Sequence, residues 1–266
     1  MTESRAMDAA SSATPGRALY QCATLYSSLL LFALLCLSWS LLTVPLFLLL
    51  PRAMARRAGR YGIMTVFWLY THWLERCGAY RLDLRAVETL RNTGPLILAP
   101  NHPSLIDAIL ILSRQPNLSC VMKADLLGNI LLGPGARLAR YIHNGSPRQM
   151  VRESVTELRR GGLVLLFPEG TSTARAPLDS FKGSVGVIAR RANAPVQTLL
   201  IETDSTFLSK DCAMWTRPSL PITHRVRLGR RFDPPQDPET LRLELERYFR
   251  SELTHATLRG GSWPCR

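Results

Sequence analysis

The sequence predicts an α/β fold, with a mixed central sheet flanked by helices and an N-terminal membrane-embedded helical module. Two observations lead to this expectation: a long uncharged apolar stretch lies near the N-terminus, and strand-like and helix-like runs alternate from about residue 80 onwards. The 266 residues suffice for one α/β domain with an appendage. We therefore expect a disordered terminus at 1–17, membrane-anchoring helices at 18–78 and an α/β domain at 79–266.

The first apolar stretch is long enough to reach across a membrane. No charged residue stands between Arg17 and Arg52, and a helix needs about 20 apolar residues to cross the hydrocarbon core. Pro45 predicts either a kinked span or a re-entrant helix pair within the stretch. The shorter aromatic segment 61–74 favours a helix at the membrane interface.

The net charge of +13 admits two kinds of anionic partner, nucleic acid and a membrane surface. The sequence has no nucleic-acid-binding motif, and its basic residues flank the apolar segments, so we expect membrane lipids and no nucleic acid as partners. The larger basic cluster follows the apolar stretch, with Arg52, Arg56, Arg57 and Arg60 there against Arg5 and Arg17 before it. By the positive-inside rule, the part of the chain after the stretch faces the cytoplasm.

The cysteines and histidines show no metal-ligand spacing. Six cysteines without a CxxC pair predict free thiols in a reducing compartment. The five histidines are equally scattered, so we expect no metal site.

The α/β domain is built from short apolar runs, several of them bounded by glycine or proline, as is typical of buried strands. Strands are expected at 95–99, 119–123, 140–143, 163–167, 196–202 and 224–230. Helical patterns lie between and after them, at 104–113, 146–160, 184–193 and 238–253. In the second of these helices Ser146 is the expected N-cap, Pro147 opens the first turn and Gly161 ends the helix.

The motif NHPSLID (101–107) places a histidine and an aspartate at HX4D spacing just after the first predicted strand. The carboxyl ends of strands are where α/β sheets present their ligands. Pro103 can open a helix, so Asp107 would accept from one ring nitrogen of His102 and leave the other free to take a proton. No protein nucleophile stands out, so the natural proton donor is a substrate hydroxyl. A His–Asp bond that only caps the helix is the alternative.

A second motif, FPEGT (167–171), ends the predicted strand 163–167 and lies at the same edge of the sheet. Pro168 ends the strand, Glu169 can hold an acceptor hydroxyl, and Gly170 lets a backbone approach closely. Alone, the pattern is that of an ordinary strand-to-loop turn. Two such motifs after strands, downstream of a membrane module, favour a shared active site.

Together, NHPSLID and FPEGT resemble the two main signature blocks of the glycerolipid (lysophosphatidic acid type) acyltransferase family. The resemblance covers roughly residues 95–202, with further similar blocks at VMKADL (121–126), FKGSVGVIAR (181–190) and APV (194–196). It implies transfer of an acyl group from acyl-CoA or acyl carrier protein to an acceptor hydroxyl. It also implies that the reaction needs no metal, no cofactor and no covalent acyl-enzyme.

The resemblance implies a role for each matching residue. His102 would deprotonate the acceptor, and Asp107 would orient His102. Lys123 would lie where the thioester oxyanion develops. The residues expected to bind substrate are Asn101, Lys123, Glu169, Gly170, Thr171 and Lys182. For the two lysines, a solvated surface position is the alternative.

The chain departs from the family at two positions that bear on the acceptor. Members that make phospholipids usually carry arginines there, because a planar guanidinium binds the acceptor's phosphate through two hydrogen bonds. Here Ser172 follows FPEGT, and His143 or Asn144 stands in the second block. Arg148 and Arg175 lie nearby in the sequence but in a different register.

These departures leave two acceptors open. The leading expectation is 1-acyl-sn-glycerol-3-phosphate, which would give phosphatidic acid for phospholipid biosynthesis. The alternative is a non-phosphate envelope lipid, because YIHN (141–144) and FLSKDCAMWTRP (207–218) resemble a bacterial subgroup found with aryl-polyene pathways. In either case we expect a bacterial inner-membrane enzyme with its catalytic domain, at 79–266, on the cytoplasmic side. A membrane-anchored binding protein without turnover is the non-enzyme alternative.

Overall fold

The computed structural model describes residues 15–91, 93–173, 178–210, 212 and 215–259. The helices are α2 (Pro15–Leu49), α3 (Arg52–Arg76), α4 (Arg85–Glu88), α5 (Asp107–Leu112), the 3₁₀ turn η1 (Ala124–Gly128), α6 (Gly133–Ala139), α7 (Pro147–Arg159), α8 (Ser184–Ala192) and α9 (Pro238–Arg259). The strands are β1 (Tyr80–Asp83), β2 (Leu96–Pro100), β3 (Leu118–Met122), β4 (Ile142–His143), β5 (Leu163–Leu165), β6 (Val196–Thr203) and β7 (Ile222–Phe232).

The seven strands form one sheet in the order β1-β7-β6-β2-β5-β3-β4. Strands β2 to β6 are parallel to one another, whereas β7 runs antiparallel to β6 and pairs in parallel with β1. The sheet is therefore mixed, as the sequence predicts. Because the carboxyl ends of β2 and β5 meet at one edge, the two motifs that follow them are brought together there.

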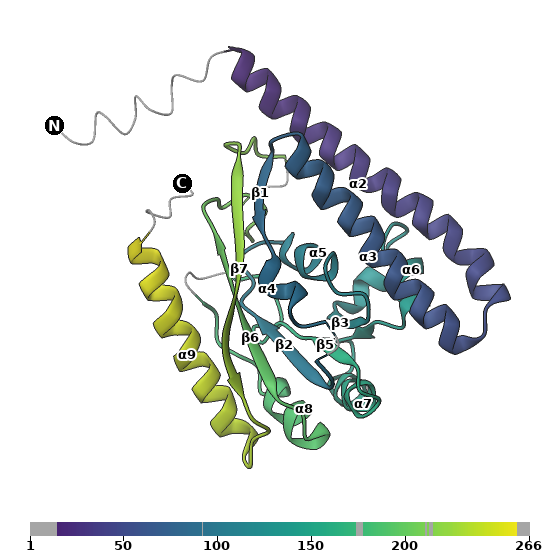
Figure 1. Ribbon diagram of the computed structural model, residues 1–266, viewed down its shortest axis with the longest axis vertical. Helices are drawn as coiled ribbons and strands as arrows, with labels where there is room; N and C mark the ends of the chain where they lie inside the picture. The colour runs from purple at the N-terminus through teal and green to yellow at the C-terminus, as the bar shows by residue number, and fades with distance from the viewer. Residues whose placement is uncertain (1–14, 92, 174–177, 211, 213–214, 260–266) are drawn as a thin grey trace.

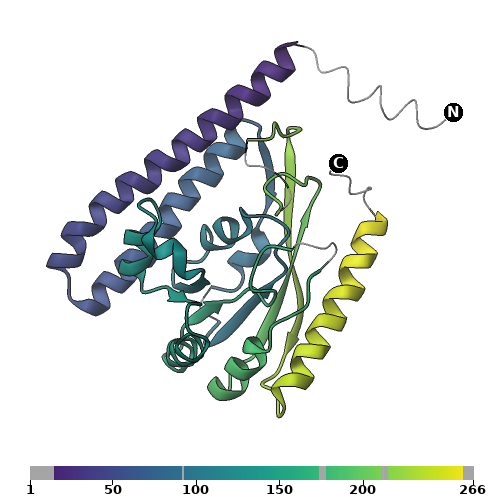
Figure 2. The ribbon, with the colours of Figure 1, turned by 180° about the vertical axis from the view of Figure 1, so that it is seen from behind.

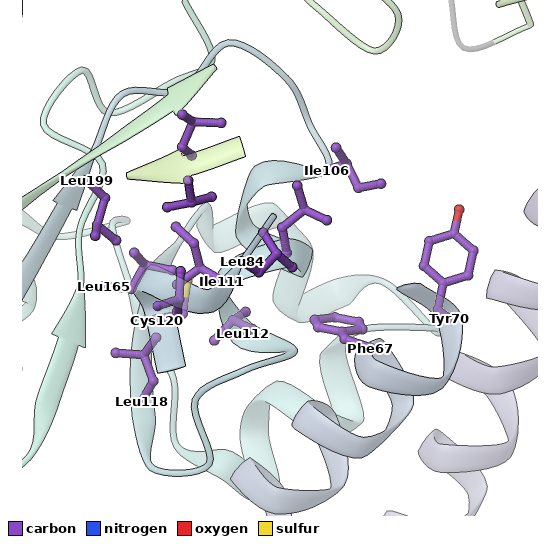
Figure 3. Packing of buried hydrophobic residues seen from close by; sticks show 14 of the residues in the cluster. Phe67, Tyr70, Leu84, Ile106, Ile111, Leu112, Leu118, Cys120, Leu165 and Leu199 are labelled. Atoms are coloured by element: carbon purple, nitrogen blue, oxygen red, sulfur yellow. The ribbon is translucent and has the colours of Figure 1, made fainter. Parts of the chain in front are cut away.

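Helices cover both faces of the sheet (Figures 1 and 2). Alternate strand residues serve two separate cores, so that Leu98 faces α3 and α5 whereas Ile97 faces α7, α8 and α9. Figure 3 shows the first core, in which Phe67 of α3, Ile111 of α5 and Leu165 of β5 belong to one cluster. The motif after β2 therefore lies above a core that the N-terminal helices help to form.

Helix α2 buries polar and apolar residues on the side that faces the protein, and it is apolar on the side that faces away. Its buried positions are Gln21, Thr24, Leu25, Ser28, Cys36, Ser40 and Thr43. Its exposed positions include Leu19, Leu30, Leu34, Leu41, Leu42, Phe47, Leu48 and Leu49. It is also the helix, within the described residues, that is long and apolar enough to cross a membrane. An outward apolar face of this extent is costly in water, so it is consistent with membrane association.

The buried side of α2 is attached to the rest of the protein at both ends. Near its C-terminus the hydroxyl of Ser40 donates to the carbonyl of Leu131 at 2.9 Å. Near its N-terminus the hydroxyl of Tyr20 donates to the carbonyl of Cys77 at 2.6 Å. Figures 1 and 2 show α2 lying alongside α3 over most of its length. The two helices therefore form one unit with the α/β domain.

Four expectations about the elements need adjustment. Pro45 lies within one continuous helix, and the chain reverses at Leu50 and Pro51, so the helix pair is α2 with α3. Strand β1 and helix α6 were not predicted, and the helix of the first motif begins only at Asp107. The helix α2 begins at Pro15, whereas 1–14 of the expected disordered terminus lie outside the described residues. The N-cap at Ser146 is confirmed, because its hydroxyl accepts from the backbone N–H of Gln149 at 3.4 Å.

Candidate active site

His102 and Asp107 form the predicted pair at the carboxyl end of β2. Nδ1 of the imidazole lies 2.9 Å from Oδ2 of the aspartate, which is fully buried. The backbone N–H of Ser104 donates to the same oxygen at 2.7 Å, which fixes the carboxylate at the start of α5. Nε2 of His102 makes no hydrogen bond within the described part of the chain, and 14% of the side chain is exposed. The free nitrogen is therefore available to a substrate.

The ring of His102 is also held from the side of the second motif. Phe167, the first residue of the FPEGT motif, stacks on the imidazole with a centroid distance of 4.0 Å and an interplanar angle of 26°. Two contacts therefore fix the orientation of the imidazole ring. The hydrogen bond to Asp107 fixes its rotation, and the stacking on Phe167 fixes its plane.

The FPEGTST loop also binds the backbone of His102. The N–H of His102 donates to Oε1 of Glu169 at 3.1 Å. The carbonyl of His102 accepts from the N–H of Thr173 at 2.8 Å, and the hydroxyl of Thr173 lies 3.1 Å from the same carbonyl. The two motifs are thus one structural unit, and Phe167 and Thr173 belong to it although neither was among the predicted site residues.

The carboxylate of Glu169 points into the protein. It is buried, and it accepts from the N–H of His102 and the hydroxyl of Thr173 through Oε1, and from the N–H of Asp179 through Oε2. Burial raises the pKa of Glu169 above its ordinary value, and these donors oppose the rise. The prediction that Glu169 contacts the acceptor differs from this geometry, which favours a role in positioning His102.

Asn101 has a similar internal role. Its side chain is buried and exchanges two hydrogen bonds with the backbone of Ile201 on β6, at 3.0 and 2.7 Å. Both of these bonds tie the NHP turn to the neighbouring strand. The geometry favours support of the turn over the predicted contact with substrate.

The other predicted binding residues line the same edge of the sheet. Gly170 has a φ of +76°, which suits glycine, and the end of the Lys182 side chain, including Nζ, lies where a Cβ would collide with it. Thr171 is partly exposed, and Lys123 is exposed at the end of β3, next to β5 in the sheet. The structure joins Lys182 to the FPEGT turn, and it leaves Lys123 without a hydrogen bond to His102 or Asp107.

No arginine of the described chain occupies the two positions that bear on the acceptor. Ser172 is buried, whereas Asn144 is partly exposed and its Oδ1 accepts from the backbone N–H of Ala124. His143 is partly exposed, although its Nδ1 is buried and has no hydrogen-bond partner among the residues that the structure describes. Arg148 lies exposed in the first turn of α7, and Arg175 is outside the described residues.

An apolar cavity of about 180 Å³ is lined in part by residues that follow His102 and flank Asp107 in the sequence. Leu105, Ala108 and Ile109, from the same motif and helix as Asp107, form one wall. The other walls come from α2, α3, β3 and α6, with Trp39 and Phe67 among the larger side chains. The lining offers almost no polar surface, so the cavity suits a hydrocarbon chain.

The chain is similar in sequence to known proteins. Residues 81–202 match the model of the family described as Acyltransferase. Over 134 residues the chain is 32% identical to the lyso-ornithine lipid O-acyltransferase of Pseudomonas aeruginosa, covering 48% of this chain and 51% of that protein. Over 131 residues it is 26% identical to the chloroplastic 1-acyl-sn-glycerol-3-phosphate acyltransferase LPAT1 of Arabidopsis thaliana, covering 47% and 37%. The chain thus spans about half the length, or less, of these curated relatives.

The fold is similar to a solved structure over nearly the whole chain. The crystal structure of the 1-acyl-sn-glycerophosphate acyltransferase PlsC from Thermotoga maritima superimposes with a TM-score of 0.67, at 20% sequence identity. The alignment covers 94% of this chain and 98% of that one, so it includes the N-terminal helices. At this identity the likeness concerns the fold.

Proposed function

Since residues 81–202 match the model of the family described as Acyltransferase, we propose that the chain moves a fatty acyl group from a thioester donor to a hydroxyl of a lipid acceptor. The observation that carries the proposal is the His102–Asp107 pair, together with an apolar cavity lined by Leu105, Ala108 and Ile109 of the same motif and helix. A base next to a place for a hydrocarbon chain is the arrangement that this transfer requires.

The proposed reaction uses His102 twice. Its Nε2 takes the proton of the acceptor hydroxyl as that oxygen attacks the thioester carbonyl carbon. The tetrahedral intermediate then collapses, the C–S bond breaks, and the imidazolium returns the proton to the leaving thiolate. Asp107 stabilises the imidazolium that forms between the two steps. The products are an ester and a thiol, with no covalent acyl-enzyme.

The residues around the pair have supporting roles in this proposal. Phe167, Glu169 and Thr173 hold the imidazole and its backbone in place. Lys123 is the proposed donor to the oxyanion, because a cation at the end of β3 lies at the same sheet edge as His102. Lys182, packed on Gly170, is the proposed contact to the anionic part of a substrate.

The leading acceptor is 1-acyl-sn-glycerol-3-phosphate. The Arabidopsis thaliana relative and the Thermotoga maritima protein are both named for this class of acceptor. Lys182 can supply positive charge for its phosphate. The donor, acyl-CoA or acyl carrier protein, is left to experiment, since both present the same thioester.

A lysolipid without phosphate is the second candidate acceptor, and two observations favour it. The positions where phospholipid-making members usually carry arginine hold a buried Ser172 and the pair His143–Asn144. The Pseudomonas aeruginosa relative, at 32% identity, is named for lyso-ornithine lipid. Both candidates share an acyl chain and a free hydroxyl, so the reaction is the same.

We propose that the enzyme works at a membrane surface, with α2 and α3 as its anchor. The outward face of α2 is apolar, and its attachment to Leu131 and Cys77 keeps the whole helix beside the domain. This favours a helix pair lying in one leaflet, since a span would carry part of the domain with it. The basic residues after α2 support the inner bacterial membrane with the domain on its cytoplasmic side.

The test is acyl transfer by the purified full chain in detergent micelles. Radiolabelled palmitoyl-CoA and palmitoyl-acyl carrier protein are supplied in turn, with lysophosphatidic acid or a lyso-ornithine lipid as acceptor. We expect thiol release that depends on the acceptor, with a labelled diacyl product identified by mass spectrometry. The inactive control is His102→Ala. If no combination releases thiol above that control, the proposal fails, and the membrane-anchored binding protein becomes the better interpretation.

A further inference from the structure

A second histidine, His224, is buried in the same core as Asp107. It lies on β7, where the register pairs it with Leu82 of β1 and Thr203 of β6. Its neighbours two residues away, Ile222 and Val226, pack in the cluster that includes α5. Only 1% of the histidine is exposed. Strand alternation therefore aims its ring at the layer that holds Asp107.

Three polar atoms in this layer are left without a partner. Within the described residues, neither Nδ1 nor Nε2 of His224 has a hydrogen-bond partner, and the same is true of Oδ1 of Asp107. An unsatisfied buried polar group costs about 1–3 kcal/mol, and such groups are uncommon in folded proteins. That a histidine and a carboxylate oxygen are both unsatisfied in one core suggests that they satisfy each other.

The two residues also act on each other electrostatically. Burial lowers the pKa of His224, and the charges of Asp107 and Asp204 oppose that shift. The imidazole is therefore neutral, with one N–H to donate and one nitrogen to accept. Tyr80, whose ring centroid lies 5.7 Å from that of His224, has its pKa raised by burial first and then by its neighbours, which include Asp107.

We propose that His224 is a positioning residue for the transfer reaction, whose neutral imidazole donates an N–H through one buried water to Oδ1 of Asp107. A water is the link because the two side chains share no direct hydrogen bond, and because buried waters typically satisfy two to four polar groups. Asp107 is then held on both oxygens, by His102 and Ser104 on Oδ2 and by His224 on Oδ1. The inference rests on the proposed function of His102 as the base.

This arrangement has a consequence for the pH at which His102 works. A donor to Oδ1 stabilises the carboxylate charge, and its loss makes the His102–Asp107 pair easier to protonate, wherever the proton resides. The free base would then exist only at higher pH. The other titratable groups that face His224 are Tyr80, which burial keeps neutral, and the exposed Asp204, which accepts from the backbone N–H of Thr223 at 2.8 Å.

The test compares His224→Phe with His224→Gln across the pH range. In His224→Phe, which keeps a planar ring without a donor, the acidic limb of kcat/KM should move up by about one pH unit. At neutral pH kcat should fall about tenfold, with KM for donor and acceptor changed less than about threefold. His224→Gln, which restores a donor, should return both quantities to within about threefold of the parent.

A second measurement does not need turnover. The ¹⁵N signals of the His102 ring, followed by NMR as the pH changes, should titrate at higher pH in His224→Phe than in the parent protein. The matched control is His72→Phe, since that histidine stacks on Trp68 of α3, away from the pair. If the His102 titration and the acidic limb are unchanged in a folded His224→Phe protein, the inference is overturned. A shifted titration in a chain that transfers no acyl group would support the inference and count against the proposed function alone.

Discussion

Two pairs of side chains, one after β2 and one between α3 and α7, differ in a way that distinguishes a candidate active site from a structural ion pair. His102 and Asp107 lie 2.9 Å apart, but the histidine keeps 14% of its side chain exposed and one nitrogen free. Arg60 and Glu157 lie 2.6 Å apart, with only 1% and 9% of their side chains exposed. The first pair keeps one imidazole nitrogen free near the surface. In the second pair most hydrogen-bonding groups are already bound to buried partners.

The partners of each pair confirm this difference. Arg60 also donates to Asn117 and to the carbonyl of Ala139, so it joins α3 to three separate parts of the domain. His102 makes one side-chain bond and a ring stack, and its other bonds use its backbone. Removal of a side chain from the first pair should therefore change activity, and removal from the second should change stability.

The largest expected effect is on activity, in His102→Ala. Because the base is lost while the backbone bonds to Glu169 and Thr173 remain, acyl transfer should fall by at least about 10³-fold. The midpoint of thermal unfolding should change by less than about 3 °C, since the side chain is partly exposed and contributes little to the core. Thiol release and thermal unfolding of the same preparation check both statements. Substantial activity in this variant would contradict the assignment of His102 as base.

The next effect is on stability, in Arg60→Met. This change leaves Glu157 buried with only Arg56, at 3.6 Å, so the free energy of unfolding should drop by about 3–5 kcal/mol. The protein that remains folded should keep its kcat. Arg56→Met is the matched control, because that side chain is 24% exposed, and it should cost about 1 kcal/mol or less. Equal losses in the two variants would show that burial does not distinguish the two arginines.

The same pair predicts a pH dependence of stability. Burial alone would raise the pKa of Glu157, but the hydrogen bond and charge of Arg60, with Arg56, bring it below the ordinary value. The contribution of the pair is therefore fully present above the unfolded pKa of about 4.3 and is lost as the pH falls through the lower folded value. Chemical denaturation between pH 3 and pH 7 should show this loss in the parent, and Glu157→Gln should lack that part of the slope.

The sequence predicts the interior of the fold better than its edges. Apolar runs bounded by glycine or proline gave β2, β3, β5 and β6 within a few residues, because these strands are buried on both faces. Strand β1 was missed because its residues, YRLD, carry two charges at the edge of the sheet. Helix α6 was missed because it contains two glycines and a proline, and its packing against α3 supplies what local preference lacks.

At the candidate active site, the local sequence pattern predicts the His102–Asp107 pair but not the residues that hold it in place. His102 and Asp107 lie five residues apart, so spacing alone suggested their contact. The bonds of Asn101 to Ile201 and of Glu169 to His102 span 100 and 67 residues, and they depend on which strands are neighbours. His224 gives no signal at all in the sequence, since it stands in an ordinary alternating strand.

The third expected effect tests whether Glu169 supports His102 or binds the acceptor. In Glu169→Gln one side-chain oxygen can still accept a hydrogen bond, but the new NH₂ group faces a backbone N–H. The hydrogen bond to the N–H of either His102 or Asp179 is therefore lost. We expect kcat to fall about 10–100-fold while KM for the acceptor changes less than about threefold. The control is Glu153→Gln on α7, whose carboxylate accepts from Gln149 at 2.8 Å. A large rise in KM with kcat unchanged would instead restore the predicted contact with acceptor.

The smallest expected effect lies one step further from the reacting atoms, in Thr173→Val. The change removes the hydroxyl that lies 3.1 Å from the carbonyl of His102 and 3.0 Å from Oε1 of Glu169, but it keeps the backbone N–H bond at 2.8 Å. Since one hydrogen bond of this kind contributes about 1 kcal/mol, kcat should fall about three- to tenfold, and Thr173→Ser should be close to the parent. Thr156→Val, which removes an equivalent bond to a backbone carbonyl on α7, should leave kcat unchanged. If kcat of Thr173→Val equals that of the control, the backbone hydrogen bond alone holds the turn, and the hydroxyl has no role in catalysis.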